Sequence, residues 1–244
     1  MKLVSCFNVE IIEDFNDLIT LILIDCNGIK SIKRLSHLRM LKIKTCQKIK
    51  TISNLSNLTN LNIKESRKIK TISNLSNLTD LNIEDCRSIE KIVNVNNLIN
   101  LKIFLRSNLN SIEGLSSLNS LRSLTMTRCG NFDNINQGLE KLKLYHCRIT
   151  DTSITRLTKL TSLSLINYGD IEYGKCDPWK KVNDTLIGKL TNLTELYIKG
   201  YDTITNTSIE NLTNLTRLEI DRCGGISSDI KLPRLKIFEY EEIE

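Results

Sequence analysis

The chain has 244 residues, of which 40% are hydrophobic and 25% are charged, and its formal net charge is +6 at pH 7. That apolar content is enough for a buried core, and no apolar run approaches the ~18 residues that a membrane-spanning helix requires. Basic and acidic residues number 34 and 28, so composition excludes the strongly one-signed charge that is typical of many nucleic-acid-binding domains.

A short phrase returns twelve times along the chain: an apolar residue, any residue, an apolar residue, two residues of any kind and then usually a cysteine or an aromatic residue. Its copies begin at Met1, Leu21, Leu41, Leu61, Leu81, Leu101, Leu124, Leu142, Leu163, Leu196, Leu218 and Leu235. The first six copies start 20 residues apart, and a fixed period of this length is the sequence mark of a solenoid. Because its apolar residues alternate with others, each phrase predicts a short β-strand.

Between the phrases, apolar residues continue at every third position, as at Ile49, Ile52, Leu55 and Leu58. A spacing of three drifts off the buried face of a helix with 3.6 residues per turn, so it predicts a tight return through turns, 3₁₀ segments or short helical segments. Stacked repeats of this kind predict one α/β-type solenoid domain over residues 1–244, with a parallel sheet and right-handed connections.

The pattern resembles the leucine-rich repeat family, whose signature is Leu-x-x-Leu-x-Leu-x-x-Asn/Cys-x-Leu and which residues 58–69 and 78–89 carry here. This resemblance covers essentially the whole chain. It implies a horseshoe with about 12 short parallel strands on its concave face and turns or short helical segments on its convex face. Residues 55–61 look like the short repeats of internalins and of phosphatase-regulating leucine-rich proteins. Residues 147–151 resemble the cysteine-containing repeats of ubiquitin-ligase adaptors.

Seven of the eight cysteines occupy the last position of the phrase: Cys6, Cys26, Cys46, Cys86, Cys129, Cys147 and Cys223. Stacking would place them in a row with parallel Cα–Cβ vectors, which suits neither a disulfide nor a tetrahedral metal site. They therefore predict a buried ladder of reduced thiols. His146 and the neighbouring Cys147 should point to opposite faces, so they do not form a nucleophile and base pair. We expect no enzyme activity, no metal and no cofactor.

The charges expected on the concave face are mixed. Lys42, Lys44 and Lys64 cluster there, but Asp80 and Glu84 interrupt them. A nucleic-acid groove needs a continuous basic track with stacking aromatic residues, so nucleic-acid binding is not favoured. Residues 48–63 recur at 68–83 with one difference, which indicates a recent duplication and spacer repeats.

Two features predict a binding surface. Four apolar or aromatic side chains stand at strand positions that should face outward from the concave sheet: Phe104, Tyr145, Ile166 and Tyr197. In addition, the phrase spacing lengthens where residues 169–181 are inserted, and this segment holds the sole tryptophan, Trp179. Insertions in a solenoid emerge as rim loops and loops often carry binding residues, although Trp179 could equally pack as a lid on neighbouring repeats.

These observations predict a non-catalytic scaffold that binds a protein partner through the concave face and the rim loop. One alternative is a regulatory or substrate-receptor subunit of a ubiquitin ligase or phosphatase complex, and another is a secreted internalin-like adhesin or effector. Met1 and Leu3 already belong to the first predicted strand, which leaves no room for a signal peptide, so we expect an intracellular, reducing location. The first predicted strand has an exposed edge, and Val4 and Ile22 add apolar surface at this Met1 side, which predicts edge-mediated self-association.

Overall fold

The structure is a computed structural model that describes residues 1–105, 112–128, 136–147, 154–167 and 182–241. Its contacts divide the chain into two compact units, unit 1 from Met1 to Leu121 and unit 2 from Arg122 to Glu244. In both units the architecture is a parallel β-solenoid with few helices. The prediction of one domain over the whole chain stays a prediction.

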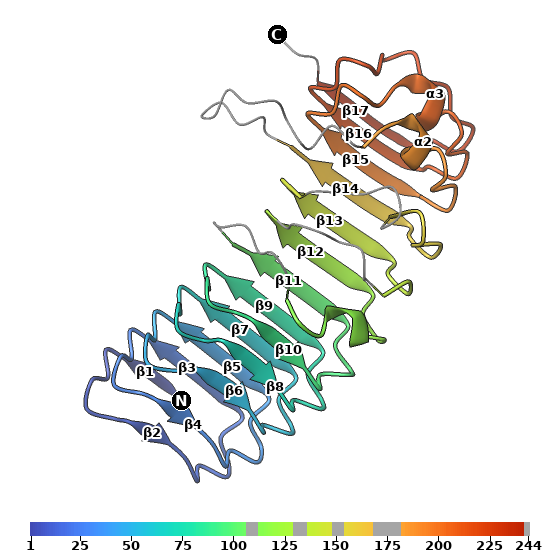
Figure 1. The fold of residues 1–244 in the computed structure, drawn as a ribbon. Helices are drawn as coiled ribbons and strands as arrows, with labels where there is room; N and C mark the ends of the chain where they lie inside the picture. The colour runs from blue at the N-terminus through green and yellow to red at the C-terminus, as the bar shows by residue number, and fades with distance from the viewer. Residues whose placement is uncertain (106–111, 129–135, 148–153, 168–181, 242–244) are drawn as a thin grey trace. The chain divides into compact units, whose positions relative to one another are not determined.

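Unit 1 contains six parallel strands that follow one another in chain order (Figure 1). They are β1 (Lys2–Val4), β3 (Thr20–Ile24), β5 (Met40–Lys44), β7 (Asn60–Lys64), β9 (Asp80–Glu84) and β11 (Asn100–Phe104). The register advances by 20 residues from strand to strand, so that Leu41 lies between Leu21 and Leu61. The 20-residue period of the sequence is thus the offset between paired residues on neighbouring parallel strands.

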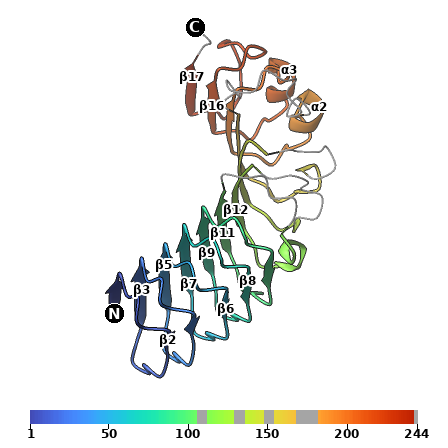
Figure 2. The same cartoon turned by 60° about the vertical axis from the view of Figure 1, so that its left-hand side comes forward.

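The returns of unit 1 contain short strands, which differs from the turns and 3₁₀ segments that the sequence predicts. β2 (Ile11–Ile12) pairs with β4 (Ser31–Ile32), while β6 (Thr51–Ser53), β8 (Thr71–Ser73) and β10 (Lys91–Val93) form a separate three-stranded sheet (Figure 1). Figure 2 labels β2, β6 and β8 among these return strands. A 3₁₀ helix is described at Leu115–Ser117. The physical reason is that β-branched Thr and Ile occupy these returns, and such residues favour a pleated, half-buried surface.

The core of unit 1 lies between the main sheet and the returns. Strand positions two and four point inward, as Leu41 and Ile43 do, and the returns contribute the apolar residues at every third position. At the two corners of a repeat the backbone adopts a left-handed conformation, for example at Glu65 (φ 53°) and Asn74 (φ 55°). Asparagine tolerates this region better than most residues. The side chain of Asn94 also donates to Oδ1 of Asn74 at 2.8 Å.

Unit 2 supplies six further parallel strands. They are β12 (Ser123–Thr127), β13 (Lys141–Tyr145), β14 (Ser162–Ile166), β15 (Glu195–Lys199), β16 (Arg217–Asp221) and β17 (Ile237–Glu241). Its returns include two one-turn helices, α2 (Asp184–Ile187) and α3 (Asn206–Ile209). Asn183 caps α2 by accepting a hydrogen bond from the N–H of Leu186 at 3.1 Å. In the described part of the chain no helix has the length and apolar character needed to cross a membrane.

The two units together provide twelve strands of the predicted kind among the described residues. The phrase predicted at Leu235-x-Ile237 is nevertheless out of register. Phe238 lies beside Leu218 and Tyr240 beside Ile220, while Ile237 is 41% exposed. Phe238 and Tyr240 therefore take the inward positions of the last strand, because ladder pairing with β16 outweighs the local apolar pattern.

The cysteine ladder is present among the described residues, and five of its thiols are buried: Cys26, Cys46, Cys86, Cys147 and Cys223. Each thiol donates to the carbonyl of the residue two positions before it, as Cys86 does to Glu84 at 3.3 Å. Ser66 takes the same place in the fourth repeat and donates to the carbonyl of Lys64 at 3.1 Å. These hydrogen bonds thus connect the last residue of each strand to the turn that follows it. Cys129 lies outside the described residues.

Candidate binding face

The outward face of each sheet consists of the side chains at strand positions one, three and five, which point away from the core. In unit 1 this face contains a groove of about 300 Å³, which we call the asparagine groove. Its outward-pointing lining residues are Met40, Lys42, Asn60, Asn62, Asp80, Asn82, Asn100 and Lys102. The groove crosses β5, β7, β9 and β11, and a lysine stands at either end of its middle row.

Hydrogen bonds order one side of the asparagine groove. Asp80 accepts from the side-chain amide of Asn100 at 2.8 Å and from the hydroxyl of Thr79 at 2.7 Å. At the fifth positions of β7 and β9, the ammonium group of Lys64 donates to the carboxylate of Glu84 at 2.6 Å. This hydrogen bond raises the pKa of Lys64. Oδ1 of Asn82 is buried and has no hydrogen-bond partner among the described residues. A buried acceptor without a partner carries a desolvation cost.

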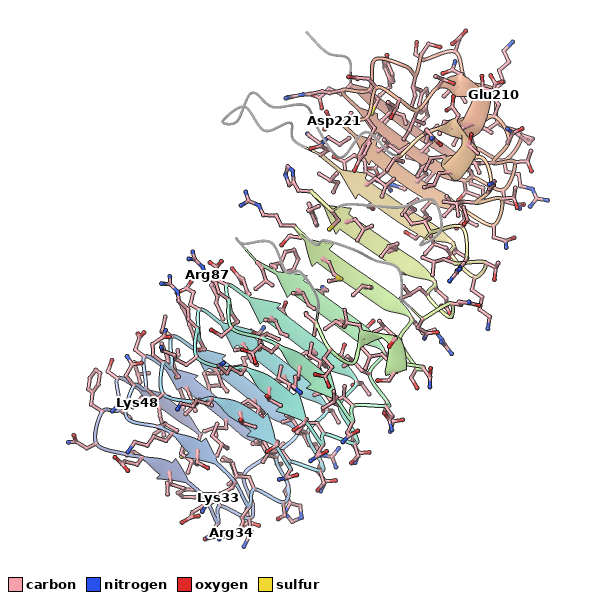
Figure 3. The ribbon with its side chains drawn as sticks, viewed as in Figure 1. Lys33, Arg34, Lys48, Arg87, Glu210 and Asp221 are labelled. Carbon is pink, nitrogen blue, oxygen red and sulfur yellow. The ribbon has the colours of Figure 1, made fainter. Side chains whose placement is uncertain are left out.

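In unit 2 the outward face carries a charged cluster of Tyr197, Lys199 and Asp221, the last of which Figure 3 labels. The ammonium group of Lys199 forms an ion pair with Oδ2 of Asp221, and the hydroxyl of Tyr197 donates to the same oxygen at 3.4 Å. The side chains of Lys199 and Asp221 are only 15% and 12% exposed. The guanidinium group of Arg222 lies 3.6 Å from the other carboxylate oxygen of Asp221, so Asp221 has two cationic partners. Removing Asp221 would leave the largely buried Lys199 without its carboxylate, which is destabilising.

Two of the predicted binding residues lie on this outward face of unit 2 as half-buried side chains. Tyr145 ends β13, and the ammonium group of Lys143 lies 5.3 Å from its ring centroid, within the range of a cation–π contact. Tyr197 stands at the third position of β15 and belongs to the charged cluster. Both tyrosines are therefore accessible and also held in place by polar contacts.

The expectation that Ile166 presents an accessible apolar side chain is wrong. Its strand position is outward, but the residue is only 2% exposed. In the ladder it lies between Tyr145 and Lys199. The long side chains of Tyr145 and Lys199 therefore flank Ile166 on both neighbouring strands. The alternation of residues along one strand does not reveal burial by neighbouring strands.

Phe104 ends β11, beside Glu84, and is half-buried. It belongs to unit 1, whereas Tyr145, Ile166 and Tyr197 belong to unit 2. Trp179 and the insertion at 169–181 lie outside the described residues. Their predicted role at the rim stays a prediction.

The asparagine groove and Lys199 are not among the binding residues predicted from the sequence. Asparagines recur at outward positions in three successive strands, which is a signal that the repeat alignment already contains. The partnership of Lys199 with Asp221 needs the register of β15 and β16.

Cys147 is buried, and its thiol donates to the carbonyl of Tyr145 at 3.4 Å, so it is not an exposed nucleophile beside His146. Within the described ranges no three His, Cys, Asp or Glu side chains gather closely enough to hold a metal ion.

Comparison with known proteins finds no family model and no curated protein that matches the chain. Solved structures do match. An internalin of Listeria monocytogenes is 21% identical with a TM-score of 0.36, and the match covers 88% of this chain and 82% of that one. A leucine-rich-repeat protein of Leptospira interrogans is 21% identical with a TM-score of 0.46, over 91% and 72% of the two chains. TLR13, in a complex with ssRNA13, is 14% identical with a TM-score of 0.43; the match covers 99% of this chain and 50% of that one.

Proposed function

We propose that this chain, a leucine-rich-repeat solenoid, is a non-catalytic scaffold that binds a protein partner through the outward face of its sheet. The observation that carries the proposal is the pair of tyrosines on the outward face of unit 2. Tyr145 and Tyr197 lie on β13 and β15, two strands apart, which is roughly 10 Å in a sheet with strands about 4.8 Å apart.

Tyrosine is among the residues that most often dominate the energy of a protein interface. Here each ring is partly ordered before binding, Tyr145 by Lys143 and Tyr197 by Asp221. Such contacts reduce the conformational entropy that association would otherwise cost. The charged groups beside the tyrosines supply the polar rim that a specific interface needs.

The test compares the wild-type chain with the double variant Tyr145→Ala/Tyr197→Ala in affinity capture from extracts of the source cells. The control is Lys159→Ala/Lys189→Ala, which changes two exposed residues of the returns in the same unit. We expect a protein that the wild type and the control retain and that the tyrosine variant loses. With that protein purified, the tyrosine variant should bind at least tenfold more weakly.

Circular dichroism and thermal unfolding establish that both double variants are folded. Equal retention of every captured protein by the tyrosine variant and the wild type would refute the proposed surface.

The proposal includes the intracellular, reducing location expected from the sequence. It is supported by the geometry of the ladder, in which described thiols such as Cys86 donate to backbone carbonyls.

A further inference from the structure

A basic hollow lies on the return side of unit 1, away from the outward face. Its volume is about 690 Å³, and it lies between β4 and β6. Ten residues line it: Lys30, Ser31, Ile32, Lys33, Arg34, Lys48, Lys50, Thr51, Ser53 and Asn54. Five of them are cations and none is acidic. Figure 3 labels Lys33, Arg34 and Lys48.

Three of the five cations are neutralised by the first repeat. Lys30 pairs with Glu10 at 2.6 Å, and Lys33 and Arg34 both contact Glu13, at 3.1 and 2.8 Å. Arg34 also contacts Asp14 at 2.7 Å.

The other two cations, Lys48 and Lys50, are exposed, and neither has an ion pair within the described ranges of the chain. The hollow therefore retains two positive charges that are not in ion pairs, although Lys48 lies close enough to Glu10 to contribute to the lowered pKa of that carboxyl group. A phosphate monoester carries about −1.5 to −2 charges at pH 7.

The ladder of the returns is interrupted at the same place. At the equivalent position of neighbouring repeats the backbone N–H donates to the carbonyl 20 residues earlier: Lys30 to Glu10 at 2.8 Å, Lys70 to Lys50 at 2.8 Å and Glu90 to Lys70 at 2.9 Å. β4 and β6, in contrast, belong to different sheets. Among the described residues, the N–H groups of Lys50 and Thr51 have no acceptor.

These groups are the parts of an oxyanion site. Backbone N–H groups that converge beside positive side chains bind phosphate and related anions. Ser31, Thr51, Ser53 and Asn54 also line the hollow and carry hydroxyl or amide groups that can donate. We propose that the hollow between β4 and β6 binds a phosphate group, held by Lys48, Lys50 and the free N–H groups of Lys50 and Thr51.

The chain contains a matched control for this site. Residues 48–63 and 68–83 are identical except at one position, so Lys68 has the same local sequence as Lys48. In the later repeat, however, the ladder is intact, because the N–H groups of Lys70 and Thr71 both donate to the carbonyl of Lys50. If local sequence alone attracted the anion, Lys68 would matter as much as Lys48.

The experiment titrates inorganic phosphate into the folded chain and follows backbone amide shifts by NMR, with chloride at matched ionic strength as the reference. We expect saturable shifts at the amides of Lys50 and Thr51. The variant Lys48→Gln/Lys50→Gln should bind phosphate at least tenfold more weakly, whereas Lys68→Gln should change its affinity less than twofold. Because these side chains are exposed, the variants should fold normally, which circular dichroism checks.

A second arm distinguishes the source of the phosphate group. A phosphoserine peptide that displaces phosphate from the same amides, when its unphosphorylated form does not, identifies a modified protein segment. A peptide that fails to compete while phosphate binds identifies a small phosphate compound. Shifts that chloride reproduces, shifts spread over every lysine-rich repeat, or equal losses in Lys68→Gln and Lys48→Gln/Lys50→Gln would each overturn the proposal. The outward-face tyrosines take no part in these measurements, so they are independent of the proposed protein-binding function.

Discussion

Replacing Ser66 by alanine should destabilise the solenoid, although it removes only one oxygen atom. The hydroxyl is fully buried, accepts from the N–H of Cys46 at 3.1 Å and donates to the carbonyl of Lys64. In Ser66→Ala that carbonyl keeps the hydrogen bond from the N–H of Thr45, at 3.0 Å. The N–H of Cys46, however, loses its acceptor inside the core. An unsatisfied buried donor costs about 1–3 kcal/mol, so we expect a loss of about that size.

The substitution Ser66→Cys should be much milder. At the equivalent place in unit 2, the sulfur of Cys223 accepts from the N–H of Tyr201 at 3.5 Å, which shows that a thiol can take over both hydrogen bonds. Ser56→Ala, an exposed turn substitution, is the control and should stay within about 0.5 kcal/mol of the wild type.

Equilibrium unfolding in urea measures the free energies of these variants, and amide hydrogen exchange locates the change. Repeat arrays can depart from two-state unfolding, so the exchange measurement is the sharper one. The amide of Cys46 should lose protection in Ser66→Ala by about tenfold or more and largely recover it in Ser66→Cys. If Ser66→Ala matched the wild type both in urea and at that amide, the reasoning about the ladder would be refuted.

Three further perturbations have defined outcomes. Burial raises the pKa of the Cys86 thiol to about 11 from an ordinary value of 9.0. The stability that the protonated thiol contributes is therefore complete below pH 9 and is lost as the pH rises through about 11. The urea midpoint of the wild type should fall across this window more steeply than that of Cys86→Ser, and equal slopes would contradict the role of Cys86. Lys199→Met should destabilise the chain, by less than the roughly 3–5 kcal/mol of a fully unpaired buried charge, because Asp221 would keep only Arg222, 3.6 Å away, and the hydroxyl of Tyr197 as partners; adding Asp221→Leu should restore much of the urea stability. The first repeat exposes apolar side chains such as Phe15, 51% exposed, and its strand β1 is a free edge of the sheet. We therefore expect the chain to self-associate and Phe15→Asp to weaken the association; sedimentation that shows a monomer at all concentrations would exclude it.

Most of the repeat architecture follows from local patterns. Inward positions such as Leu41 and Ile43 and the buried ladder of cysteines can be assigned from the 20-residue period, because every repeat faces the same two neighbours. The pattern fails where neighbours are missing or different. In the last strand, for example, pairing with β16 alone selects Phe238 over the apolar residues just before it.

The binding surfaces divide in the same way. The outward strand positions of Tyr145 and Tyr197 can be assigned from the chain's residue pattern, since alternation along a strand is a local property. Three other features require the folded arrangement: Ile166 is covered, Lys199 meets Asp221, and the N–H of Lys50 lacks the acceptor that the N–H of Lys70 has. Each of these depends on contacts between residues about 20 or more positions apart, and almost identical repeats such as 48–63 and 68–83 acquire different chemistry because their neighbours differ.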